Sequence, residues 1–60
     1  MSDYRQLVAD SIQKCESSAA DLRSAAKQVA NNTAKNSFEQ AAKELEETAA
    51  KCKIALKQLY

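Results

Sequence analysis

The chain has 60 residues and a formal net charge of +1, from nine lysine and arginine residues and eight aspartate and glutamate residues. This length allows one small domain, and the interspersed charges argue against the clustered basic surface of a nucleic-acid-binding protein. Glycine and proline, which supply most tight turns between strands, are absent. More than half of the residues are alanine, glutamate, lysine, glutamine or leucine, so this alanine-rich composition favours an all-α fold.

Membrane contact and secretion are not expected. No apolar run approaches the roughly 18 residues that span a bilayer, and no basic segment followed by an apolar one indicates a signal peptide. Two cysteines are too few for the disulfide framework of a small secreted protein. We therefore expect a cytoplasmic protein.

The first predicted element is a helix over about residues 3–30, with Ser2 and Asp3 as candidate N-caps. Its apolar residues recur in alternating steps of four and three, which is the heptad pattern of coiled-coil packing. The core positions predicted on this helix are Val8, Ile12, Cys15, Ala19, Leu22, Ala26 and Val29.

The segment NNTAKNS, residues 31–37, is the one place without helical patterning, so we expect a turn at about residues 31–36. Asn31 or Asn32 is expected to take the left-handed conformation that ends a helix where glycine is unavailable. Asn36 with Glu39, or Ser37 with Gln40, is expected to cap the next helix.

The second predicted helix covers about residues 36–59. Folding the chain at residues 33–34 brings Leu22 opposite Leu45 and places Cys15 and Cys52 in one layer. The sequence therefore predicts a single domain, an antiparallel two-helix hairpin. The core positions predicted on the second helix are Phe38, Ala41, Leu45, Thr48, Cys52, Ala55 and Leu59.

Further apolar residues lie beside the predicted core and widen each apolar stripe beyond a two-helix seam. The simplest cover is a second copy, which predicts a homodimer or higher homo-oligomer that forms a four-helix bundle. The alternatives are a lone hairpin and a partner of different sequence, and Ile54 lies outside both surfaces. The residues assigned to the oligomer interface are Tyr4, Leu7, Ala25, Ala42, Ala49 and Leu56.

The chain lacks histidine and a glycine-rich phosphate loop, so we expect neither enzymatic activity nor a cofactor. Cys15 and Cys52 are the only pair with chemical potential. They are expected as reduced thiols in a core layer, and two alternatives stay open: a disulfide and a soft-metal site. A site for zinc or copper(I) would use four thiols, if two hairpins align with both turns at one end.

The expected function is that of a non-enzymatic structural or protein-interaction module. One alternative is a thiol-based metal-binding or redox protein that uses Cys15 and Cys52. The second is a small RNA-binding bundle, although acidic residues interrupt its basic residues. The basic residues of that alternative are Arg5, Lys14, Arg23 and Lys27.

The spacing of Gln13, Cys15, Ser18, Ala19 and Leu22, followed by AKNSFEQAAKELEE at 34–47, resembles a family of short two-helix proteins. That family is a domain-of-unknown-function group known mainly from spore-forming Firmicutes, and the similarity covers about residues 8–59. It implies a helical hairpin and supplies no activity. In architecture the chain also resembles the Rop-type bundle, a dimer of two-helix hairpins that binds RNA.

Overall fold

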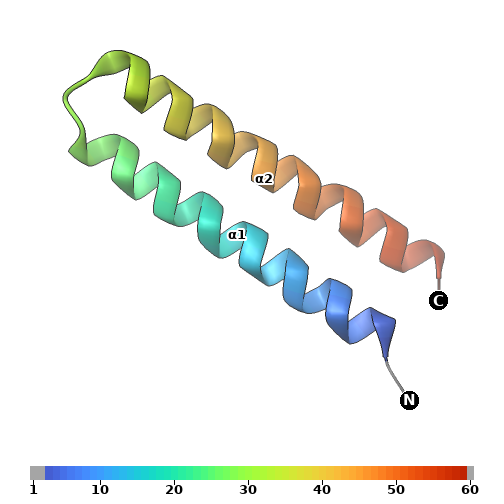
Figure 1. Ribbon diagram of the computed structural model, residues 1–60. Coiled ribbons are helices and arrows are strands. Elements are labelled where there is room, and N and C mark those ends of the chain that lie inside the picture. The colour runs from blue at the N-terminus through green and yellow to red at the C-terminus, as the bar shows by residue number, and fades with distance from the viewer. Residues whose placement is uncertain (1–2, 60) are drawn as a thin grey trace.

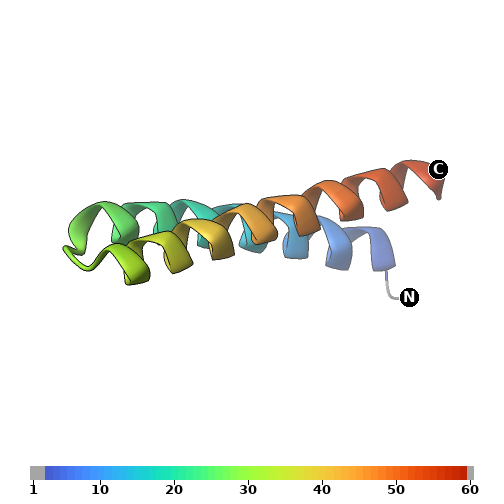
Figure 2. The same ribbon diagram turned by 90° about the horizontal axis from the view of Figure 1, so that it is seen from above.

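The computed structural model describes residues 3–59 and contains two antiparallel helices, α1 (Tyr4–Gln28) and α2 (Asn32–Gln58), joined by residues 29–31 (Figure 1). The predicted all-α fold and two-helix hairpin are confirmed, and no strand occurs within residues 3–59. Figure 2 shows that the helices cross along their length. The Cα trace measures 47 × 18 × 10 Å, so the hairpin is a single layer of helices.

Helix α1 begins at its expected cap. The Asp3 carboxylate accepts a hydrogen bond of 3.0 Å from the backbone N–H of Arg5, which satisfies a donor that the first helical turn leaves free. The same bond lowers the pKa of Asp3. The helix ends at Gln28 because Val29 is extended, with φ −97° and ψ 143°. Ser2, the other candidate cap, lies outside the described residues.

Helix α2 begins at Asn32, earlier than the predicted residue 36. The Asn31 side chain accepts a hydrogen bond of 2.9 Å from the backbone N–H of Ala34 and acts as the N-cap. The predicted caps at Asn36 and Ser37 and the turn at residues 31–36 are therefore wrong. The left-handed asparagine is also wrong, because no residue within 3–59 has positive φ. Polar residues alone did not break the helix, since an exposed first turn tolerates them once it is capped.

Two ion pairs join the helices. Arg23 pairs with Glu46, and Lys53 Nζ lies 2.7 Å from Glu16 Oε2. In each pair the residue numbers total 69, and the two pairs are seven residues apart on both helices.

Both ion pairs are diagonal, because the three-residue connection leaves the end of α1 nearly level with the start of α2 (Figure 1). The buried residues Ile12 and Ala49, like Ala19 and Ala42, have numbers that total 61, so the predicted facing pairs, whose numbers total 67, are offset by about 9 Å along the axes.

The fully buried strip consists mainly of alanine. On α1 the predicted core positions Ile12, Ala19 and Ala26 are buried. The other four predicted positions on α1 are half-buried. On α2 the buried residues are Ala42 and Ala49, which are 0% and 2% exposed. Small side chains seven residues apart allow the helix axes to approach to the short end of the usual range of about 8–10 Å.

The predicted core of α2 is wrong in one of its two heptad series, because Phe38, Leu45 and Cys52 are half-buried whereas the other series is displaced by one residue. Ala42 and Ala49 were assigned to the oligomer interface, yet both lie buried inside the hairpin. Thr48, Ala55 and Leu59 were assigned to the core, yet all three are exposed. Alanines at both 41 and 42 give two heptad series of nearly equal apolar content, which differ by one residue or about 100° of rotation. The structure uses the series that leaves the Thr48 hydroxyl outside and half-buries Leu56.

Candidate interaction surface

The two long sides of the hairpin differ in chemistry on either side of the buried strip. Glu16 and Lys53 meet on one side, which we call the bridged face. Each follows a cysteine by one residue, and one residue turns an α-helix by about 100°. Both cysteines are turned in the same sense from residues that meet, so Cys15 and Cys52 both lie on the opposite side, which we call the open face.

The bridged face is held by the two charged pairs. The guanidinium of Arg23 donates to both carboxylate oxygens of Glu46, with Nε at 3.3 Å from Oε2. This two-pronged geometry is the strongest form of such a pair. The hydrogen bond lowers the pKa of Glu46 and raises the pKa of Arg23. Both side chains stay nearly half exposed, so the pair adds little stability.

The open face consists of two strips on each helix, and none of its sixteen positions carries a charge. A chain that is 28% charged would place about four charges there by chance. Ten of the sixteen are half-buried and six are exposed. The inner strips hold Val8, Cys15, Leu22, Val29, Phe38, Leu45, Cys52 and Leu59, and the outer strips hold Tyr4, Ser11, Ser18, Ala25, Ala34, Ala41, Thr48 and Ala55.

The predicted oligomer residues divide between these regions. Tyr4 and Ala25 lie on the open face, and Leu7, which is 62% exposed, lies beside it near the start of α1. Leu56 is half-buried in line with the buried strip. The sequence analysis assigned the residues of the inner strips to a closed core, so it did not predict that they form part of a surface. A hairpin one layer thick leaves them partly uncovered.

Two hydroxyl groups on the open face have acceptors within their own helix. The Ser11 hydroxyl donates to the Leu7 carbonyl at 3.0 Å, and the Thr48 hydroxyl donates to the Glu44 carbonyl at 3.0 Å. Covering these two side chains therefore leaves no unsatisfied donor, whose burial would cost roughly 1–3 kcal/mol.

The cysteines are free thiols and both are half-buried. The three-residue connection leaves the end of α1 nearly level with the start of α2 (Figure 1), so Cys15 and Cys52 are offset by about 9 Å along the helix axes. The register therefore does not support the predicted shared layer. The described residues contain no group of three or more histidine, cysteine, aspartate or glutamate side chains that could hold a metal ion.

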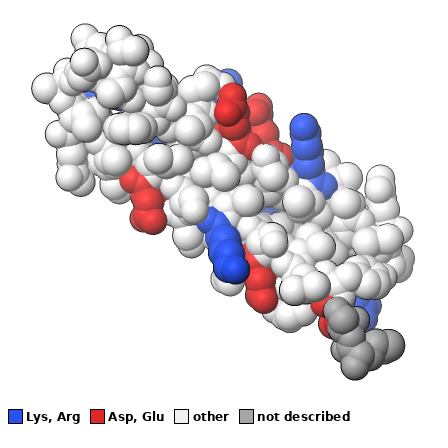
Figure 3. Space-filling view, in the orientation of Figure 1, with Lys and Arg blue, Asp and Glu red and all other residues white. Residues whose placement is uncertain are grey.

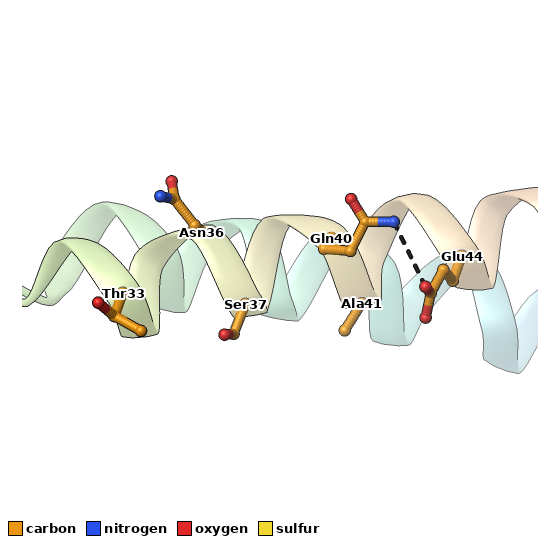
Figure 4. Close-up of a pocket in the computed structure, with 6 residues that line it drawn as sticks. All are labelled: Thr33, Asn36, Ser37, Gln40, Ala41 and Glu44. Atoms are coloured by element: carbon orange, nitrogen blue, oxygen red, sulfur yellow. Dashed lines mark hydrogen bonds between the residues drawn. The ribbon is translucent and has the colours of Figure 1, made fainter.

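Two shallow depressions occur on the outside of single helices. One is lined by Thr33, Asn36, Ser37, Gln40, Ala41 and Glu44, all of them on α2, and the other lies entirely on α1 (Figure 4). A hydrogen bond of 3.3 Å joins Gln40 to Glu44 across the first. No second element closes either depression, so neither has the enclosed shape of a small-molecule site.

Charge is mixed over the visible surface. Figure 3 shows acidic and basic side chains interspersed on that face, mostly along its edges. Of the four basic residues in the RNA-binding alternative, Arg23 pairs with Glu46 and Arg5 pairs with Asp3. Within residues 3–59, neither helix has the length and hydropathy required to cross a membrane.

Comparisons with protein-family models, with curated proteins and with solved structures find no match to this chain. The resemblances to the spore-former family and to Rop-type bundles therefore stay predictions.

Proposed function

We propose that this chain is a non-enzymatic structural or protein-interaction module that works as a homodimer, with two hairpins packed open face to open face in a four-helix bundle. The observation that carries the proposal is the uncharged, half-buried open face of a hairpin only 10 Å thick. Domains are built from at least two packed layers, and a single layer leaves its apolar strips in water.

The exposed area supports a partner of this size. The accessible surface is 4663 Å² for a chain of 6.6 kDa. A compact monomer of that mass exposes about 3,900 Å². The excess is about 800 Å², which is the area that each partner buries in a standard interface. Within residues 3–59 the hairpin alone buries Ile12 and four alanines and no other side chain, so its own core is small.

A second copy fits the chemistry of the face. Both helices contribute the same arrangement, an inner strip of larger apolar residues beside an outer strip of mainly small ones. Such a surface is complementary to itself, as a two-fold interface requires. The small outer residues allow another hairpin to approach closely, and the net charge of +1 brings little repulsion between copies.

Adjacent serines provide the test. Ser18 lies on the open face and Ser17 lies outside it, and both are exposed in the hairpin. Ser18→Glu places a charge in the proposed interface, so we expect association at least about tenfold weaker, a change of 1.4 kcal/mol or more. Ser17→Glu is the matched control and should associate like the unmodified chain. Sedimentation equilibrium at micromolar concentration measures both.

The unmodified chain should sediment at twice its mass. A monomer with full, cooperative helicity would contradict the proposal, as would equal weakening by both glutamates. Specific binding of a different protein by that monomer would instead favour the alternative partner.

A further inference from the structure

We infer that the two copies of the dimer lie with their turns at opposite ends, so that the open end of each hairpin covers the turn end of the other. The open end is where α1 begins and α2 ends, and the turn end holds residues 29–31 (Figure 1). The inference rests on the proposed function, since it states how a second copy sits on the open face. It follows from the way side-chain size changes along that face.

The inner strips are bulkier toward the turn. Leu22 is nearly level with Phe38, because their numbers total 60, close to the total of 61 for the buried pairs. By the same count Val8 is nearly level with Cys52, toward the open end. We call Leu22 and Phe38 the bulky pair, and Val8 and Cys52 the small pair. All four side chains are half-buried, so each pair still presents surface to a second copy.

Exposed bulk has the opposite distribution. Tyr4, Leu7 and Leu59, at the open end, are 52%, 62% and 54% exposed. Toward the turn the outer strips carry only Ala25 and Ala34, and both are half-buried. Large uncovered side chains therefore accompany the small pair at the open end, whereas alanines flank the bulky pair near the turn.

An arrangement with opposed turns matches these sizes. The two hairpins are equally long, so each layer of the open face then meets a layer from the other end. The bulky pair packs over the small pair of the second copy, and the exposed side chains of the open end extend over the alanines near its turn. With both turns at one end, the bulky pairs would stack on each other and hold the small pairs apart. The space left there would cost free energy, because protein interiors are close-packed.

Spin labels measure the arrangement. In the background Cys15→Ala/Cys52→Ala, one cysteine is introduced by Gln28→Cys at the end of α1 or by Ser17→Cys near its middle, and both positions are exposed. The two positions are about 16 Å apart along the helix. We expect the distance between two Gln28→Cys labels to exceed that between two Ser17→Cys labels by about 10 Å or more, as measured by pulsed electron paramagnetic resonance.

Ser17→Cys is the matched control, because a label near the middle of the hairpin reports the dimer in either arrangement. Equal distances at the two positions would overturn the inference alone, since the turns would then share one end. A monomer with no distance at either position would overturn the proposed function as well. Circular dichroism checks that each labelled variant is helical.

A second measurement keeps both native cysteines. Two copies are joined, end to start, by five glycine and serine residues, which span at most about 18 Å. In a dimer with opposed turns the open ends lie roughly 40 Å apart, the length of one helix. We therefore expect this fusion to associate further at concentrations where the separate chain is a dimer, and a fusion with a linker several times longer to sediment at its own mass. A short-linked fusion that also sediments at its own mass, while the separate chain is a dimer, would overturn the inference.

Discussion

The bridged face and the open face border the same buried strip, but one carries paired charges and the other carries partly uncovered apolar side chains. On the bridged face, Arg23–Glu46 and Glu16–Lys53 join the helices through exposed charges. On the open face, the equivalent positions one residue earlier carry Leu22, Leu45, Cys15 and Cys52, which remain partly uncovered. Charges that pair in water need no further cover, whereas apolar side chains gain free energy from being covered.

The largest expected effect is on the open face. In the proposed dimer Leu45→Ala removes a covered leucine and should cost about 2–5 kcal/mol. In an isolated hairpin the loss would be smaller, because Leu45 is only half-buried. Urea unfolding at several protein concentrations measures the loss.

Ile54→Ala is the control on the outer side of α2, where the side chain is 58% exposed, and it should cost less than about 1 kcal/mol. Equal losses at Leu45 and Ile54 would contradict the assignment of the two faces.

Substitutions at two neighbouring alanines test which side of α2 packs against α1. Ala49 is 2% exposed and Ala50 is exposed. Ala49→Leu forces extra volume between closely spaced helices and should cost about 1–3 kcal/mol. Ala50→Leu should change the free energy of unfolding by no more than about 0.5 kcal/mol. Thermal melts of the two variants compare these losses. A larger loss for Ala50→Leu than for Ala49→Leu would contradict the burial of Ala49 between the helices.

Both faces also depend on where α2 begins. Asn31→Ala removes the side-chain acceptor 2.9 Å from the Ala34 N–H and should cost roughly 1 kcal/mol. Asn36→Ala, at the cap position predicted from the sequence, should have little effect. Denaturant unfolding of the two variants compares them, and a larger loss at Asn36 would place the helix start later.

The smallest effect is expected on the bridged face. Pairing with Arg23 lowers the pKa of Glu46 in the folded chain below its ordinary 4.5. Its stabilising contribution is therefore complete above that value and is lost as the pH falls through the lowered pKa. Glu46→Gln should reduce the loss of thermal stability between neutral and acid pH, and added salt should reduce the contribution of the pair.

Glu47→Gln, at the neighbouring exposed position, is the control and should keep the pH dependence of the unmodified chain. An unchanged pH dependence in Glu46→Gln would show that the pair contributes nothing to folding.

The sequence by itself determined the hairpin, the direction of its helices and the core of α1. Val8, Ile12, Cys15 and Ala19 have no competing heptad series, so the rotation of α1 was predictable. The absence of glycine and proline left one polar segment for the turn, and Asp3 was a recognisable cap. Matched spacing also placed both cysteines on one side of the hairpin, whereas the register does not support the shared layer predicted for them.

Only the tertiary structure decided the rotation of α2 and the position of its first residue. Ala41 and Ala42, like Ala49 and Ala50, are chemically identical neighbours, so local pattern cannot choose between them. Packing against α1 decides between them. The observed rotation of α2 buries Ala42 and Ala49 and lets Arg23 pair with Glu46, and both contacts require the other helix. The open face follows from the same choice, since it consists of the residues that remain uncovered once the alanines are buried.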